Sequence, residues 1–392
     1  MTSKLWVFRD IDPDRRTALA RALSISPATA SLLLARGVTT PDEATAWMAP
    51  LPAHDPFLIP DIEAAIDRLH YAVQHRERVC FYGDYDVDGM SATSIYYSFF
   101  RGLGANVQAY VPHRIREGYG LNEGAVRTLA AEGVKLLVTS DCGTTSHHEI
   151  AVANQLGMDV IVTDHHQTDE QMPAALAVMN PHRREARYPF RGLCSGGLAY
   201  KVADAYRQRY GQGTVALDSL LDLVALSTIA DVVPLQDENR GFVQEGLRQL
   251  SRGARCGIRA LKQVAGVTRE CTSETVGFKL GPRLNAAGRL DHAIKGVQLL
   301  TTESESEAMQ LAQELEQLNR RRQDLEAEIM REAVAALGDG EVPPAIVLAS
   351  RGWHLGVVGI VAARLMERYH RPAIVMAINE QGIGKGSART IP

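Results

Sequence analysis

Short apolar runs alternate with segments of helical spacing from residue 60 to residue 180 of this 392-residue chain. Strands that alternate with helices of about ten residues build right-handed βαβ units and a mostly parallel sheet. The expected strands are Val79–Tyr82, Val107–Val111, Lys135–Thr139, Asp159–Val162 and Ala177–Met179. The expected helices are Ile62–Gln74, Met90–Phe100, Glu123–Ala131 and His147–Gln155. The sequence therefore predicts an α/β fold with a mostly parallel sheet and flanking helices.

The C-terminal part predicts a long connector helix and a second, smaller α/β domain. Residues 303–337 have helical spacing and mixed charge, and a charge run such as Arg320-Arg321-Arg322 is usually a solvated helix face. Two short apolar runs and a helical segment follow, and we expect a final turn. These four elements are the strands Ala345–Leu348 and Ala373–Ala377, the helix Val357–Arg368 and the turn Gly384–Arg389.

The N-terminal 50 residues predict small helices. One of them begins with Thr40 as its N-cap, Pro41 at its first position and Glu43 at its third, and prolines at residues 50 and 52 end it. The length alone suggests two or three domains. We expect an N-terminal helical extension (1–55), a catalytic α/β domain (56–245), a basic and helical connector (246–340) and an incomplete second α/β domain (341–392).

Composition excludes several classes of protein. Hydrophobic residues make up 45% of the chain and charged residues 22%, which is ordinary for a globular protein. The net charge of −4 means that any nucleic-acid-binding surface is local. The five cysteines are scattered without a C-x-x-C pair, which argues against a disulfide framework or a zinc ribbon. With no signal pattern and no membrane-spanning apolar run, we expect a cytoplasmic protein.

Three aspartates, Asp84, Asp86 and Asp88, follow the first expected strand at alternate positions. Carboxylates this close repel one another and raise each other's pKa, and a divalent cation removes the repulsion. Hard oxygen ligands suit Mg²⁺ or Mn²⁺. The same pattern opens an EF-hand calcium loop, but that loop needs a Glu at its twelfth position, where this chain has Ile95. A solvated, turn-forming acidic loop is the alternative.

Other expected strand ends carry further potential metal ligands. Asp141 follows the third strand, and Asp164-His165-His166 follows the fourth. Ligands bind at the carboxyl ends of strands in open α/β sheets, and neighbouring strands lie about 4.8 Å apart. Asp231 ends an apolar helix expected at Leu220–Ala230 and is either another ligand or a turn or capping residue. The cluster predicts a two-metal hydrolase, and imidazole biases it toward Mn²⁺.

Residues 251–289 are locally basic, with eight Lys and Arg against two Glu. They include a stretch of small residues between arginines, which lets a backbone approach a ligand while guanidinium groups bind phosphate. An ordinary basic loop is the alternative. Glycine and basic residues recur near the C-terminus. The expected substrate-binding residues are Arg283, Asn285, Arg289, Lys385, Ser387 and Arg389.

Seven motifs together resemble a known family. Gly83–Gly89, Asp141–Gly143, Asp164–His166 and Ala230–Asp231 are similar, in order, to the four signature motifs of the DHH phosphoesterase superfamily. The other three narrow the resemblance to the bacterial RecJ-type single-strand-specific DNA exonucleases. These are Arg116–Leu121, Gly281–Arg289 and Trp353–Ile360. The resemblance covers about residues 40–392, nearly the whole chain.

The resemblance implies a 5′→3′ exonuclease that releases 5′-mononucleotides from single-stranded DNA with two Mn²⁺ or Mg²⁺ ions, in DNA repair and recombination. It also implies that His166 contacts the scissile phosphate or the second ion, and that Asp164 orients its neighbours from behind. With His165 these residues would form the catalytic group. Further implied partners are a single-strand-binding protein and a recombination helicase. The implied metal ligands are Asp84, Asp86, Asp88, Asp141, His165 and Asp231.

The resemblance departs at the C-terminus. In the family, a DHHA1-type second domain continues past the Gly-Ser-x-Arg turn to a Gly-Gly-His motif and then an OB-fold, whereas this sequence stops at Pro392. OB-folds supply stacking platforms for single strands, so we expect either a fragment or a weakened grip on DNA. The alternatives are a DHH phosphodiesterase for short oligonucleotides or cyclic dinucleotides, and an inactive truncated binding protein.

Overall fold

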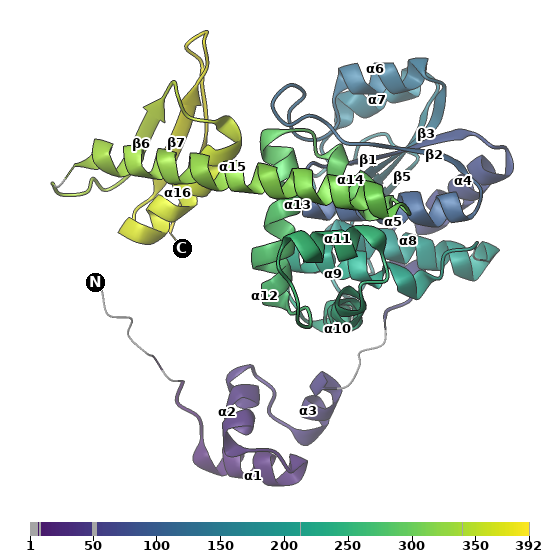
Figure 1. The fold of residues 1–392 in the computed structure, drawn as a ribbon. Helices are drawn as coiled ribbons and strands as arrows, with labels where there is room; N and C mark the ends of the chain where they lie inside the picture. Colours follow the sequence, from purple (N-terminus) through teal and green to yellow (C-terminus); the bar gives the residue numbers. More distant parts are fainter. Residues whose placement is uncertain (1–6, 8, 49–52, 212, 339, 392) are drawn as a thin grey trace. The chain divides into compact units, whose positions relative to one another are not determined.

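A computed structural model describes residues 7, 9–48, 53–211, 213–338 and 340–391. The chain divides into two compact units, Met1–Ala53 (the N-terminal unit) and His54–Pro392 (the main unit), drawn in Figure 1. Among the described residues, no single helix is long and apolar enough to cross a membrane. The helices Pro13–Leu23 and Pro27–Ala35 are long and apolar enough only when taken together, and they are bent by 114° at the break between them. The expected helix break at residues 49–52 lies outside the described residues.

The N-terminal unit consists of three short helices, α1 (Pro13–Leu23), α2 (Pro27–Ala35) and α3 (Pro41–Met48). The predicted start of α3 is confirmed by a reciprocal capping box. The Glu43 amide donates to Thr40 Oγ1 at 3.2 Å, and the Thr40 amide donates to Glu43 Oε2 at 3.1 Å. A small core holds the three helices together, and its members include Leu19, Ala30, Leu33 and Ala44.

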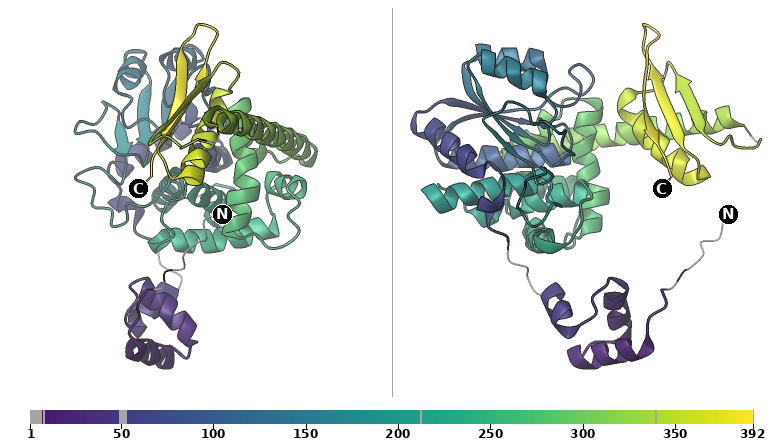
Figure 2. Two further views of the ribbon diagram at one scale, coloured as in Figure 1. Left: turned by 90° about the vertical axis from the view of Figure 1, so that its left-hand side faces the viewer. Right: turned by 180° about the vertical axis from the view of Figure 1, so that it is seen from behind.

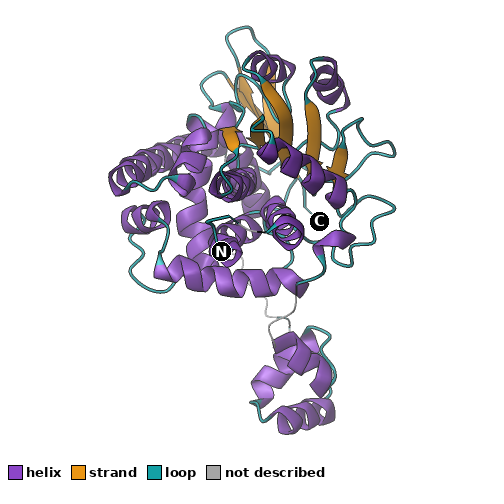
Figure 3. Ribbon diagram, turned by 90° about the vertical axis from the view of Figure 1, so that its right-hand side faces the viewer, coloured by secondary structure: helices purple, strands orange, loops and turns teal. Residues whose placement is uncertain are grey.

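The larger sheet of the main unit is entirely parallel, which confirms the predicted fold class. Its strands lie in the order β2-β1-β3-β4-β5, with helices on both faces (Figure 3). Gly83 of β1 lies opposite Ser140 of β3, and Ser140 lies opposite Thr163 of β4, so these strands end at one level. The bounds are β1 Arg78–Gly83, β2 Asn106–Tyr110, β3 Val134–Ser140, β4 Asp159–Thr163 and β5 Ala177–Met179.

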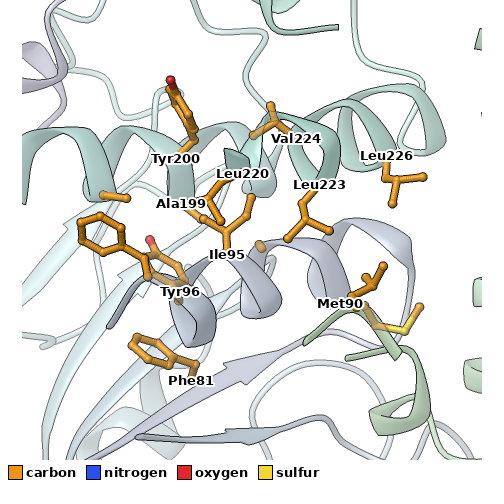
Figure 4. Packing of buried hydrophobic residues seen from close by; sticks show 14 of the residues in the cluster. Phe81, Met90, Ile95, Tyr96, Ala199, Tyr200, Leu220, Leu223, Val224 and Leu226 are labelled. Atoms are coloured by element: carbon orange, nitrogen blue, oxygen red, sulfur yellow. The ribbon is translucent and has the colours of Figure 1, made fainter. Parts of the chain in front are cut away.

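The two faces of this sheet carry separate cores, because successive side chains of a strand point to opposite faces. Phe81 packs with α5 (Val87–Gly102), α8 (Ser195–Tyr210) and α9 (Leu221–Ala230). In Figure 4, Ile95 and Tyr96 of α5 lie between Phe81 and the α8–α9 layer. On the other face, Cys80 and Tyr82 pack with α6 (Glu123–Ala131) and α7 (His147–Gln155). Both helices that carry a predicted aspartate ligand, α5 and α9, therefore lie on the same face.

Further helices surround this layer, and one of them was expected as a possible loop. The alternative of an ordinary basic loop at Gly281–Arg289 is wrong, because these residues form a helix, α13 (Gly281–Leu290). The helix at Ser195–Tyr210 had no counterpart in the prediction. The remaining helical elements are η1 (Pro56–Leu58), α4 (Ile62–Gln74), η2 (Leu217–Leu220), α10 (Asp237–Arg252), α11 (Cys256–Val264), α12 (Ser273–Thr275), η3 (Val276–Leu280) and α14 (Ile294–Thr301).

The predicted connector helix is α15 (Glu305–Leu337), which leads to a second, three-stranded sheet (Figure 2). Strand β6 (Ile346–Ser350) runs parallel to β7 (Ala373–Ile378), and α16 (Leu355–Tyr369) joins them. The expected final turn is wrong, because Gly384–Arg389 forms strand β8, antiparallel to β7. Glycine is a poor strand former, so the residues of this segment did not predict a strand. At position 386 the strand needs glycine, because a Cβ there would lie 2.2 Å from the Val375 carbonyl oxygen. The division of the main unit into catalytic, connector and second domains stays a prediction.

A buried ion pair joins α8 to α10. Lys201 Nζ lies 2.5 Å from Glu238 Oε2, and both side chains are fully buried. The ammonium also donates to the His54 carbonyl at 2.6 Å, while Glu238 accepts from the His54 amide and from the Tyr188 hydroxyl. The network thus holds the first residue of the main unit against two helices.

We expect Glu238→Gln to lower the free energy of unfolding by about 3–5 kcal/mol, because it leaves the Lys201 charge buried without its partner. Chemical denaturation measures the change. The matched control is Glu63→Gln, which removes an exposed partner of Arg209 and should cost less than about 1 kcal/mol. Equal losses in the two variants would contradict the buried-charge argument.

Candidate metal centre

The backbone ladder of the larger sheet places three acidic residues side by side. Asp84, Asp141 and Asp164 directly follow β1, β3 and β4. The amide of each donates to the carbonyl of the last residue of the neighbouring strand, at 3.2, 3.0 and 3.1 Å respectively. The ladder thus continues one residue past the strand ends, and the three side chains leave the sheet at the same edge.

Potential ligand atoms gather at this edge in three overlapping groups, each with its atoms within 4.8 Å of one another. His165 Nε2 lies 3.3 Å from an oxygen of Asp88, 3.6 Å from one of Asp231 and 3.1 Å from Asp141 Oδ1. Asp141 belongs to two of these groups and His165 also belongs to two, so these residues join the groups. The groups are Asp84, Asp86 and Asp141; Asp88, His165 and Asp231; and Asp141, His165 and His166.

The state of these carboxylates fits a pair of divalent cations. Asp84 Oδ1 is buried and has no hydrogen-bond partner in the described structure. Burial, together with repulsion from Asp86, raises the pKa of Asp84 to about 8. Burial, together with repulsion from Asp88, raises the pKa of Asp231 to about 7. Cations remove such repulsion, and a set of carboxylates with one imidazole suits Mn²⁺ or Mg²⁺.

Asp164 takes a different place from the other aspartates. Its carboxylate accepts from the amides of Thr144 (3.1 Å), His165 (2.8 Å) and His166 (3.1 Å), and it lies 2.8 Å from Nδ1 of His166. Burial raises the pKa of Asp164, but the hydrogen bonds from His166 outweigh it and lower the value to about 2. The same bond raises the pKa of the half-exposed His166. This geometry suits an orienting carboxylate behind a protonated imidazole.

Two parts of the site were absent from the prediction of site residues. Tyr119 donates to the Asp141 carbonyl oxygen at 3.2 Å, and its hydroxyl lies 3.4 Å from His166 Nδ1. It belongs to a stretch that the resemblance had singled out, without a role. The N-terminus of α8 also reaches the carboxylates, through Ser195 and Gly196. The run of small residues there was the available signal.

Two of the predicted substrate-binding residues lie against the segment Asp84–Asp88 between β1 and the first turn of α5, here called the aspartate loop. Asn285 Oδ1 accepts from the Val87 amide at 3.1 Å, and a Cβ at Gly288 would lie 2.1 Å from the Tyr85 carbonyl oxygen. Arg289 is largely buried beside this loop, and burial lowers its pKa to about 10. Helix α13 therefore packs directly on the loop that carries the three aspartates.

The other predicted substrate-binding residues lie apart from these contacts. Arg283 forms an ion pair with Glu316 of α15, with Nε 2.6 Å from the carboxylate. Lys385, Ser387 and Arg389 lie on β8, where the lysine and the arginine are exposed. No contact between these three and the predicted metal ligands is described, so their role stays a prediction.

Comparison with known proteins agrees with this site. The DHH family, N-terminal domain, matches residues 78–228. The single-stranded-DNA-specific exonuclease RecJ of Bacillus subtilis is 42% identical over 397 residues, which cover 100% of this chain and 50% of that protein. RecJ of Escherichia coli is 39% identical over 347 residues, which cover 84% of this chain and 60% of that protein. The chain thus spans about half to three-fifths of the length of these curated relatives.

Solved structures give the same result. RecJ of Thermus thermophilus in complex with Mn²⁺ superposes with a TM-score of 0.81 at 33% identity, covering 96% of this chain and 54% of that one. An exonuclease RecJ bound to manganese has a TM-score of 0.75 at 35% identity, covering 88% of this chain and 84% of that one. The chain belongs to the RecJ family of DHH proteins.

Proposed function

We propose that this chain hydrolyses phosphodiester bonds of single-stranded DNA with two divalent ions, as a 5′→3′ exonuclease that releases 5′-mononucleotides. The observation that carries the proposal is the set of overlapping ligand groups that Asp141 and His165 join. The curated relatives are single-stranded-DNA-specific exonucleases, which supports the substrate class. The direction of cleavage and the mononucleotide product rest on the motif resemblance.

The clustered residues would each have a part in holding the two ions. Asp84 and Asp86 would hold one ion, Asp88, His165 and Asp231 the other, and Asp141 both. Ions bound in this way lower the pKa of water and neutralise charge on the phosphate. RecJ of Thermus thermophilus has been solved with Mn²⁺ and with Mg²⁺, which supports either ion, and imidazole favours Mn²⁺.

His166 would act on the phosphate directly. Because its Nδ1 faces Asp164, its Nε2 is the atom left to donate to a phosphate oxygen. The hydrogen bond to Asp164 raises the pKa of His166 and so favours the cationic ring, which suits an anionic substrate. Asp164 would serve this ring as an orienting group and would not bind an ion.

The proposal extends to location and partners. Five free cysteines, four of them buried, support a reducing compartment, and we propose the cytoplasm. A single-strand-binding protein and a recombination helicase are partners that rest on the resemblance alone.

A direct assay tests the function. The purified chain is incubated with 5′-phosphorylated single-stranded DNA and Mn²⁺, beside a duplex of the same sequence, a panel of di- and trinucleotides, and an EDTA control. We expect mononucleotides from the long single strand and no cleavage in EDTA. Cleavage of the short substrates alone would favour an oligonucleotide phosphodiesterase. A folded, metal-loaded protein that cleaves none of them would refute the proposal.

A further inference from the structure

Helix α8 directs its N-terminus at Asp88. The amide of Ser195 donates to Asp88 Oδ2 at 2.8 Å, and the amide of Gly196 donates to Oδ1 at 2.9 Å. The Ser227 hydroxyl, from α9, donates to the same Oδ1. Asp88 is only 1% exposed, so these donors replace the water that the carboxylate loses on burial. The positive end of the helix dipole adds to their effect.

The same helix end also reaches the shared carboxylate. Ser195 Oγ donates to Asp141 Oδ1 at 3.1 Å, so this residue touches Asp88 through its amide and Asp141 through its hydroxyl. These two aspartates come from different parts of the sheet edge, Asp88 from the start of α5 and Asp141 from the end of β3. Ser195 thus helps to set the distance between the carboxylates of Asp88 and Asp141, which belong to different elements of the fold.

A close approach of α8 and α9 makes these bonds possible. A Cβ at position 196 would lie 2.3 Å from Ser227 Oγ, so only glycine lets the two helices meet this closely. The hydroxyl of Ser227 is further held by the Gly196 amide at 3.1 Å and lies 2.9 Å from the Cys194 thiol. The Gly196 amide, the Cys194 thiol and the Asp88 carboxylate therefore hold the Ser227 hydroxyl in one orientation.

We propose that Ser195 and Ser227 are positioning residues that hold Asp88 and Asp141 in the orientation that the two ions require. The inference rests on the proposed function, since it concerns the same metal ligands. Groups that hydrogen-bond to metal ligands typically raise metal affinity by about 10–100-fold. A purely structural role, in which the two hydroxyls only satisfy buried polar groups, would affect folding and leave metal affinity unchanged.

The test measures Mn²⁺ binding by calorimetry and by the electron paramagnetic resonance signal of free Mn²⁺, on the full chain. We expect Ser227→Ala to weaken binding at least about tenfold and to leave the melting temperature in EDTA near that of the wild type. Activity should recover at high Mn²⁺. The matched control is Thr228→Val, which removes the next buried hydroxyl of α9. This hydroxyl donates to the Val224 carbonyl and lies 3.3 Å from the Cys194 thiol, and no contact of it with a carboxylate is described.

The outcomes separate this inference from the proposed function. Wild-type Mn²⁺ affinity in folded Ser227→Ala, or an equal loss in Thr228→Val, would overturn the inference, as would a wild-type chain that binds no Mn²⁺. A wild-type chain that binds two ions but cleaves no DNA would refute the exonuclease proposal and leave the affinity comparison valid. If Ser227→Ala does not fold, Ser195→Ala decides by the same criteria, because its amide bond to Asp88 is kept.

Discussion

Asp141→Asn is expected to lower the rate of DNA hydrolysis by about a thousandfold or more while leaving the chain folded. Asp141 belongs to the group of Asp84 and Asp86 and also lies 3.1 Å from His165 of the group of Asp88 and Asp231, so its loss weakens both ions together. Two-metal sites contribute several kcal/mol to transition-state stabilisation, and each 1.4 kcal/mol is about tenfold in rate. Asparagine is the appropriate replacement because Asp141 has a φ of +67°, a left-handed conformation that asparagine tolerates and alanine does not.

The measurement pairs single-strand hydrolysis with calorimetric titration of Mn²⁺. Asp159→Asn is the matched control, since Asp159 begins β4 at the opposite end of the sheet and pairs with Arg68 at the surface. Without metal, Asp141→Asn should melt no lower than the wild type, because burial and repulsion from Asp88 raise the pKa of Asp141 and so disfavour its charged form, which asparagine removes. Near-native turnover in this variant would exclude the shared carboxylate as the centre of the site.

The sequence was sufficient to predict the sheet and the strand ends, for a physical reason. Parallel strands buried on both faces form apolar runs, and Asp84, Asp141 and Asp164 follow three such runs directly. Adjacent parallel strands then require that these residues share an edge. The prediction could not divide the ligands between two ions, because that depends on side-chain contacts such as that of His165 with Asp88.

The parts that were missed depend on contacts between distant segments. Ser195 contacts Asp88 across 107 positions of sequence, and Asn285 contacts Val87 across 198. No local pattern encodes such pairs, and the glycines that permit them resemble ordinary loop residues. The basic and small residues of Gly281–Arg289 predicted a stretch that binds substrate, whereas in the structure that stretch is a helix that supports the aspartate loop.

The affinity for Mg²⁺ should depend steeply on pH, weakening from pH 8 to pH 6 roughly a hundredfold for the ion beside Asp84 and roughly tenfold for the ion beside Asp231. Burial and repulsion raise the pKa of Asp84 to about 8 and that of Asp231 to about 7 in the metal-free chain. Below these values a cation must displace protons to bind, and each displaced proton changes the apparent affinity about tenfold per pH unit. Titration calorimetry in two buffers of different ionisation enthalpy counts the protons released.

Stability without metal should move in the opposite direction. A carboxyl group whose pKa rises from 3.8 in the unfolded chain to about 8 in the folded chain keeps its proton longer when folded. The metal-free protein therefore loses stability as pH rises from about 4 through 8. Saturating Mg²⁺ should reverse the trend, so the melting-temperature difference between Mg²⁺ and EDTA grows with pH. A difference that stays constant from pH 6 to pH 8, with no proton release, would mean that these carboxylates are ionised before the metal arrives. The pKa values of Asp84 and Asp231 would then not be raised in the metal-free chain.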